Sequence, residues 1–148
     1  MLVSNPETVV RLLYTTRHVN EYGAVSDEAF PSSEVQKEKG RTCSVVRKDI
    51  LPDPENMLYN KACADENPKK NNTKWGYFQS IAIKIRTILR ESGDYAFDVT
   101  QDIVPDEIDP ICGFAHAHIH TTVRISKSEY RKLRFTLKSL FSNNITKF

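Results

Sequence analysis

The sequence predicts a single α+β domain, in which a mixed or antiparallel sheet packs against a C-terminal helix and carries a few short helices. Three observations lead to this class. The length of 148 residues suits one continuous core, so residues 1–148 are expected to form one domain. Short segments with the two-residue period of strands alternate with segments that carry helix-start signals. Near the end of the chain, a clear strand is followed by an amphipathic helix.

Two strands are expected in the first third of the chain. Residues 9–18 (VVRLLYTTRH) and Cys43–Arg47 (CSVVR) are rich in the β-branched and aromatic residues that strands favour. Between them, Ser26 is expected to cap one short helical turn that ends near Phe30. The polar residues 32–41 are expected to form a loop.

A helix is expected to begin after Asp53, which has the side chain of an N-terminal cap. The proline and the acid that follow it both favour the first helical turn. On this helix, Met57, Leu58 and Ala62 are expected to face the core. The polar residues 65–74 (DENPKKNNTK) are the best candidate for a mobile surface loop.

Residues 77–89 fit two patterns. As a strand, the segment places one set of residues on a single face: Tyr77, Gln79, Ile81, Ile83 and Ile85. As a helix, it places another set on a single stripe: Phe78, Ile81, Ala82, Ile85, Ile88 and Leu89. We favour a strand to about Lys84 and then a short helix that ends at Gly93, because glycine often terminates helices. Residues 95–100 are expected to form a further strand, followed by an acidic loop over residues 101–113.

The last third of the chain gives the clearest signals, because residues 114–125 alternate between two faces as a strand requires. One face is mostly apolar: Ala115, Ala117, Ile119, Thr121, Val123 and Ile125. The other face carries the histidines: Phe114, His116, His118, His120, Thr122 and Arg124. Residues 126–129 (SKSE) predict a capping box, in which the serine accepts from the third amide and the glutamate reaches back. The helix after it is expected to bury Tyr130, Leu133, Leu137, Leu140 and Phe141.

The three histidines are the most suggestive chemical feature. Neighbouring residues on one face of a strand lie roughly 6.6 Å apart, so two imidazoles could bind one divalent metal ion at about 2.1 Å each. The outer two lie about 13 Å apart unless the strand bends, so all three could not easily do so. A metal site would therefore use His116 and His118 with a ligand from elsewhere. Candidates for that ligand are Asp102, Asp106, Glu107, Asp109, Cys112 and His18.

Residues 116–122 (HAHIHTT) resemble the motif of the histidine triad nucleotide-binding family, in which histidines alternate with apolar residues. The resemblance implies a nucleotide hydrolase or transferase, with His118 as the nucleophile at the α-phosphate and His116 and His120 as supporting donors. Histidine can attack in this way because much of it is neutral at neutral pH. The stretch just before the motif, residues 104–110, is acidic and prolyl, whereas that family has a glycine- and amide-rich phosphate-holding stretch.

A structural role is the main alternative for the histidine strand. Its face could be partly exposed, and the rings could bond to nearby carboxylates such as Asp98 or Asp102. In that case the histidines would neither bind a metal nor attack a substrate.

A longer set of short motifs covers most of the chain: residues 12–17 (LLYTTR), 23–26 (GAVS), Phe30, Cys43–Arg47 and 115–119 (AHAHI). The set resembles a group of uncharacterised small bacterial proteins that are often encoded beside larger genes of suspected conflict or defence systems. In that group the first histidine recurs more reliably than the second and third, which implies that neither a triad nor a metal pair is shared. The resemblance favours an accessory component of a bacterial multi-gene system that acts on a protein partner.

The net charge of +2 hides an uneven distribution. Residues 92–112 carry six acids and no Lys or Arg, whereas residues 113–148 carry seven basic residues and one acid. The basic residues around the last helix could contact a partner or nucleic-acid phosphates: Arg124, Lys127, Arg131, Lys132, Arg134 and Lys138. A solvated helix face is the simpler interpretation. Three scattered cysteines, the lack of a leader-like start and the lack of a long apolar stretch predict a cytoplasmic protein that does not contact membranes.

Overall fold

The strand at the centre of the protein, β1 (Thr8–Thr16), is buried on both faces. The structure is a computed structural model, and it describes residues 3–20, 22–31, 35, 43–70, 72–105 and 109–148. Alternate residues of β1 belong to two separate cores: Val9 and Leu13 to the first, and Val10, Leu12 and Tyr14 to the second. Because successive side chains of a strand point to opposite faces, each face of the sheet needs its own cover.

The strands form one antiparallel sheet of six members in the order β4-β5-β2-β1-β3-β6. The strands other than β1 are β2 (Cys43–Arg47), β3 (Asn72–Ile81), β4 (Phe97–Gln101), β5 (His116–Thr121) and β6 (Ile145–Lys147). The predicted α+β class, with an antiparallel sheet and a C-terminal helix that contacts it, is confirmed.

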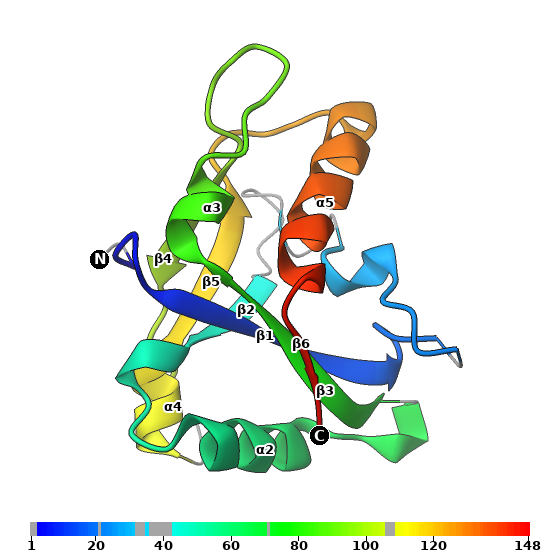
Figure 1. Cartoon of the computed structure of the whole chain (residues 1–148), viewed down its shortest axis with the longest axis vertical. Coiled ribbons are helices and arrows are strands. Elements are labelled where there is room, and N and C mark those ends of the chain that lie inside the picture. Colours follow the sequence, from blue (N-terminus) through cyan, green and yellow to red (C-terminus); the bar gives the residue numbers. More distant parts are fainter. Residues whose placement is uncertain (1–2, 21, 32–34, 36–42, 71, 106–108) are drawn as a thin grey trace.

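Helices supply the cover on both faces of the sheet. The first core takes residues from α3 (Ala82–Arg86) and α5 (Lys127–Ser142), and the second takes residues from α2 (Pro54–Asp65) and α4 (Pro110–Ala115). Figure 1 shows these two pairs of helices on opposite sides of β1. Among the described residues there are also three 3-10 helices: Asp27–Ala29, Lys48–Ile50 and Pro68–Lys70. In the described ranges, no helix is both long enough and apolar enough to cross a membrane.

An aromatic cluster fixes α5 against the first core. The rings of Phe30, Phe78 and Phe141 have centroids 5.0 to 5.5 Å apart, which is the separation of favourable aromatic pairs. The buried hydroxyl of Tyr130 donates to the carbonyl oxygen of Phe30 at 2.7 Å. The predicted apolar stripe of α5 is confirmed, and Leu140 is its partly buried member.

Of the two hydrogen bonds in the predicted capping box of α5, the one to the serine is confirmed and the one from the glutamate back to the serine amide is wrong. Ser126 Oγ accepts from the amide of Glu129 at 3.3 Å, as a capping serine does. The carboxylate of Glu129 does not reach back to Ser126. It accepts from Arg90 Nη2 at 3.0 Å and from the amide of Glu91 at 3.2 Å, so it ties the helix start to the turn before β4.

Two predictions in the middle of the chain need correction. Residues 65–74 are not simply a loop, because they contain the 3-10 helix Pro68–Lys70 and the start of β3, whose polar residues pair with the end of β1. Of residues 77–89, the strand ends at Ile81 instead of Lys84, and α3 follows it directly. Ala82 and Ile85 are buried, as the helical pattern requires, whereas Gly93 lies beyond the helix in a turn with a φ of 90°.

The acidic loop and the histidine strand also differ from the prediction. Residues 110–115 form α4, which begins with the same cap-and-proline signal as α2: Asp109 Oδ1 accepts from the amide of Ile111 at 2.9 Å, and Pro110 follows. The strand is therefore His116–Thr121 and not residues 114–125. Asp53 precedes α2 as expected, but its carboxylate accepts from the Asn56 side chain and caps no amide. Most of the predicted loop at residues 32–41 lies outside the described residues.

We expect Phe141→Ala to destabilise the protein strongly. Phe141 is fully buried against two other phenylalanines, and removing such a ring typically costs roughly 3–5 kcal/mol. The matched control is Phe135→Ala on the same helix, where the side chain is 62% exposed. Chemical denaturation should show a large loss for the first variant and a change within about 0.5 kcal/mol for the second. Equal losses would show that the aromatic cluster does not hold α5.

Candidate functional site

The three histidines of β5 lie on the face of the sheet that belongs to the second core. Ala117 and Ile119, which alternate with them, are buried in the first core. The histidines have cross-strand neighbours on both sides: His116 pairs with Val46, His118 with Ser44 and Thr100, and His120 with Asp98. The predicted alternation of this strand is therefore confirmed over its six residues.

Asp102 is the residue that links the first two histidines. His116 is buried, and its Nδ1 donates to the carbonyl oxygen of Asp102 at 2.7 Å. One carboxylate oxygen of Asp102 lies 3.4 Å from Nδ1 of His116 and 3.8 Å from Nδ1 of His118. Of the two carboxylates expected near these rings, that of Asp102 lies beside both, but the hydrogen bond of His116 goes to the main-chain carbonyl of Asp102 and not to its carboxylate. Asp98, the other candidate, instead pairs with Arg86 at 2.8 Å.

His118 is held neutral between its neighbours. Its Nε2 lies 3.0 Å from the hydroxyl of Thr100, whereas its buried Nδ1 has no hydrogen-bond partner among the described residues. Burial lowers the pKa of His118, and the ring of His120, with its centroid 5.1 Å away, lowers it further. Asp102 acts in the opposite direction. A neutral imidazole is the form that a nucleophile or a metal ligand needs.

Of the described candidate metal ligands, Asp102 lies beside His116 and His118, whereas Asp109, Cys112 and His18 do not join them. Among the described residues, no group of three or more His, Cys, Asp and Glu side chains could hold a metal ion. Asp109 caps α4, Cys112 is buried in the second core and His18 lines a separate cavity. Asp106 and Glu107 lie outside the described residues, so the metal hypothesis with either of them stays a prediction.

A polar cavity adjoins the histidine face. It has a volume of about 240 Å³, and its walls come from β1, β2, the end of α2 and the start of β3. Ser44, the cross-strand neighbour of His118, is one of its lining residues, so the cavity and the histidines lie on the same face of the sheet. The other residues that matter for its chemistry are Tyr14, Arg17, His18 and Asn72. The sequence analysis missed this cavity.

A backbone amide of β1 orients His18 in that cavity. The amide of Tyr14 donates to Nδ1 of His18 at 3.2 Å. Beside it, the pairing of β1 with β3 shifts, because Trp75 of β3 is an extra residue between the partners of Leu13 and Tyr14. Since Nδ1 accepts, the proton of the neutral ring is on Nε2. Burial, helped by Arg11 and Arg17, lowers the pKa of His18 to about 3. The Nε2 donor is buried, and no acceptor reaches it from the part of the chain that the structure describes.

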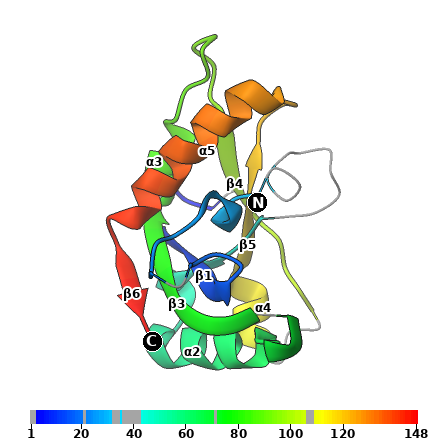
Figure 2. The same cartoon turned by 90° about the vertical axis from the view of Figure 1, so that its right-hand side faces the viewer.

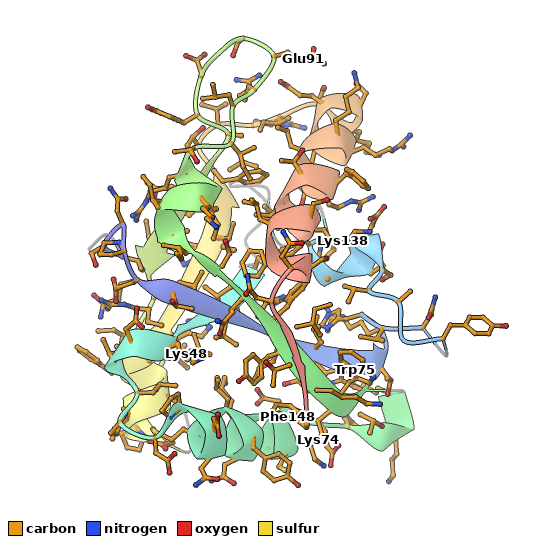
Figure 3. All side chains as sticks on the ribbon, in the orientation of Figure 1. Lys48, Lys74, Trp75, Glu91, Lys138 and Phe148 are labelled. Atoms are coloured by element: carbon orange, nitrogen blue, oxygen red, sulfur yellow. The ribbon has the colours of Figure 1, made fainter. Side chains whose placement is uncertain are left out.

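The predicted basic surface of α5 is divided by ion pairs. Lys138 and Arg134 both pair with Asp27, at 2.8 and 3.7 Å. Figure 3 shows Lys138 on the side of α5 that lies next to the 3-10 helix Asp27–Ala29. Lys132 pairs with Glu91 at 3.1 Å, with both side chains exposed. The remaining members of the predicted set are exposed: Arg124, Lys127 and Arg131. Lys132, Arg134 and Lys138 are thus engaged by acids of the same chain.

An exposed apolar surface surrounds α4. The exposed fractions of Ile103, Ile111 and Phe114 are 53%, 44% and 54%, and we call these three residues the α4 surface. A hydrogen bond of 3.1 Å from the amide of Val104 to the carbonyl of Gly113 holds the two segments side by side. Figures 1 and 2 show α4 next to α2, away from α5. The sequence analysis missed this surface because residues 101–113 were expected to be a loop.

Comparison with protein-family models, with curated proteins and with solved structures finds no match for this chain. The function is therefore argued from the geometry described above.

We expect protonation of His18 to destabilise the protein at low pH. In the folded state the ring stays neutral down to about pH 3, whereas in the unfolded state it takes up a proton near pH 6.5. Its contribution to the free energy of unfolding is complete above pH 6.5 and is lost as the pH falls to about 3. The loss is at most about 5 kcal/mol.

The control for this prediction is His18→Asn. Asparagine can still accept from the Tyr14 amide but does not titrate. Urea denaturation between about pH 7 and about pH 4 should show a steeper loss of stability in the wild type than in the variant. Parallel curves would mean that His18 is not the group responsible.

Proposed function

We propose that this chain is an accessory component of a bacterial multi-protein system and acts in the cytoplasm by binding another protein through the α4 surface. The observation that carries the proposal is the composition of α4. Its six residues, PICGFA, include no polar side chain, yet Pro110, Ile111 and Phe114 are exposed.

An exposed helix face without polar residues is unusual in a protein that works alone. Surface helices normally present polar side chains to water, and helices that are apolar all round are normally buried. Here Cys112 and Ala115 fill the second core, so the opposite side of α4 has no cover in the described chain. Burying large side chains such as Ile111 and Phe114 would contribute roughly 1.5–3 kcal/mol each.

The charge around the α4 surface indicates the chemistry of the partner. Asp102 and Asp109 flank the apolar residues, and Asp106 and Glu107 lie between them in the sequence. No Lys or Arg occurs from residue 92 to residue 112. The partner that fits is a protein with an apolar pocket rimmed by Lys or Arg, because opposite charges around an apolar contact favour association and fix its orientation.

The test compares Phe114 with Phe135, two exposed phenylalanines on different helices. A photo-cross-linking phenylalanine analogue is placed at each position, and the chain is expressed together with the products of its neighbouring genes. We expect a protein to be captured at position 114 and not at position 135. That protein is then purified, and its Kd for the chain is measured by calorimetry.

In the purified pair, Phe114→Ser should weaken binding at least ten-fold, which is about 1.4 kcal/mol, whereas Phe135→Ser should leave it unchanged. Binding should also weaken as salt is raised, because charged rims are screened. Equal effects of the two variants would refute the proposal. If only a second copy of this chain is captured, the α4 surface mediates self-association, and the proposal of a different protein partner is wrong.

Nucleotide hydrolysis by the β5 histidines is the second candidate function. The observation that favours it is the contact of one carboxylate oxygen of Asp102 with both His116 and His118, together with the Thr100 hydroxyl on the other nitrogen of His118. Such flanking groups can orient an imidazole for attack. Weighing against this function, none of His116, His118 and His120 lines any of three cavities found among the described residues.

For this second candidate, purified protein should hydrolyse nucleoside 5′-phosphate derivatives, and His118→Asn should lower the rate roughly 100-fold or more. His120→Asn should also lower the rate, because the resemblance makes His120 a supporting donor, whereas Phe135→Ala on α5, where the side chain is exposed, is the control and should leave the rate unchanged. Assays with and without added zinc or manganese separate the metal-dependent form of the hypothesis. A rate that His118→Asn leaves unchanged would eliminate it.

A further inference from the structure

We propose that the polar cavity between β1, β2 and the start of β3 binds a small molecule that carries both an oxyanion and a hydrogen-bond donor group. This site is separate from the α4 surface, so its test does not depend on the proposed protein partner. The inference rests on two buried polar atoms with unused hydrogen-bonding capacity, on the charge of the lining and on the cavity size.

The unused donor is Nε2–H of His18. The side chain is only 3% exposed, and its other nitrogen is occupied by the Tyr14 amide. Within the described chain, Nε2 has no acceptor although the residue lines the cavity. Buried donors are nearly always satisfied, and an exception at a cavity wall points to a missing ligand atom. The matching atom is an oxygen that accepts.

The unused acceptor is Oδ1 of Asn72. Its amide nitrogen donates to the carbonyl oxygen of Asp65 at 3.2 Å, which fixes the orientation of the side chain. The oxygen is buried and no donor among the described residues reaches it. Because Asn72 lines the same cavity as His18, a ligand with an N–H or O–H group beside its accepting oxygen would satisfy both atoms.

The charge of the lining favours an anionic oxygen. Arg11 and Arg17 both contribute to the cavity wall, and both lie close enough to His18 to oppose its protonation. The carboxylate of Asp65 is the acidic group among the lining residues, and Lys61 pairs with it at 3.2 Å. An oxyanion at Nε2 of His18 would therefore meet a positive environment, and guanidinium groups are well suited to carboxylates and phosphates.

The size of the cavity restricts the ligand to a small molecule. Its volume of about 240 Å³ is below the range of roughly 300–1,000 Å³ that is typical of sites for drug-sized ligands. Val10, Leu12 and Val46 supply an apolar part of the wall, so a short hydrocarbon segment also fits. Hydroxy or amino acids and small phosphate monoesters both have this combination of groups.

The experiment titrates two sets of probes into the full chain. The carboxylate set is glycolate and L-serine, with acetate as the analogue that lacks the donor. The phosphate set is glycerol 3-phosphate and phosphoethanolamine, with methyl phosphate as the analogue that lacks the hydrogen-bond donor. Binding is followed by calorimetry and by the ¹⁵N shift of His18 Nε2, which reports directly on a new acceptor.

We expect one of the two sets to bind with a Kd below about 1 mM, to shift His18 Nε2, and to bind at least ten-fold more tightly than its donor-free analogue. His18→Asn removes the donor but keeps an acceptor for Tyr14, and Arg17→Gln removes an exposed charge without touching the core. Each should weaken binding at least ten-fold. Arg131→Gln, on α5 across the sheet, is the charge-matched control and should change nothing.

Two outcomes overturn the proposal. If no probe in either set shifts His18 Nε2, the cavity holds water only, which can also satisfy buried polar atoms. If a probe binds but His18→Asn and Arg17→Gln both bind it as the wild type does, the ligand lies elsewhere. Arg17 is exposed, so its variant keeps the test decisive even if His18→Asn fails to fold.

Discussion

Burial of β1 on both faces is the constraint on which the other parts of the structure depend. It explains why the strand is almost continuously apolar, and why helices are needed on both sides of the sheet. It also makes Arg11 a problem, since a buried guanidinium must find acceptors. Arg11 donates to the carbonyl oxygens of Ala29 and Ser44, at 3.1 and 2.9 Å. Ala29 belongs to the 3-10 helix Asp27–Ala29, and Asp27 of the same helix pairs with Lys138 of α5.

The parts of the fold that the sequence predicted are those where local signals and tertiary packing agree. β1, β2, the start of α2 and the stripe of α5 have strong patterns, and the structure follows them. The errors lie where a local signal was present but overruled. Residues 65–74 are polar, yet pairing with β1 makes the last of them a strand. Asp109–Pro110 carries the same start signal as Asp53–Pro54, but acids around it suggested a loop.

The candidate sites show the same division. The histidine face of β5 follows from alternation alone, because a period of two fixes which side chains share a face. The sequence could narrow the carboxylate near the histidines to Asp98 or Asp102. It could not predict the His18 cavity, because His18 and Asn72 are distant in sequence and come together only through the register of β1 with β3. Beside this cavity the register shifts at Trp75, the extra residue of a bulge in β3, and a bulge has no reliable mark in the sequence.

The two proposed binding chemistries suit the second face of the sheet because its charges are separated along it. Asp102 and Asp109 lie at the β4 and α4 end, whereas Arg17 and His18 lie at the end of β1, with the neighbours Ser44 and His118 between them. An oxyanion is attracted to the second end and repelled by the first. A partner with a basic rim experiences the reverse. This separation of charge makes the acidic end unfavourable for a phosphate. It also lets the two proposed sites, the α4 surface and the polar cavity, act on different ligands without competing.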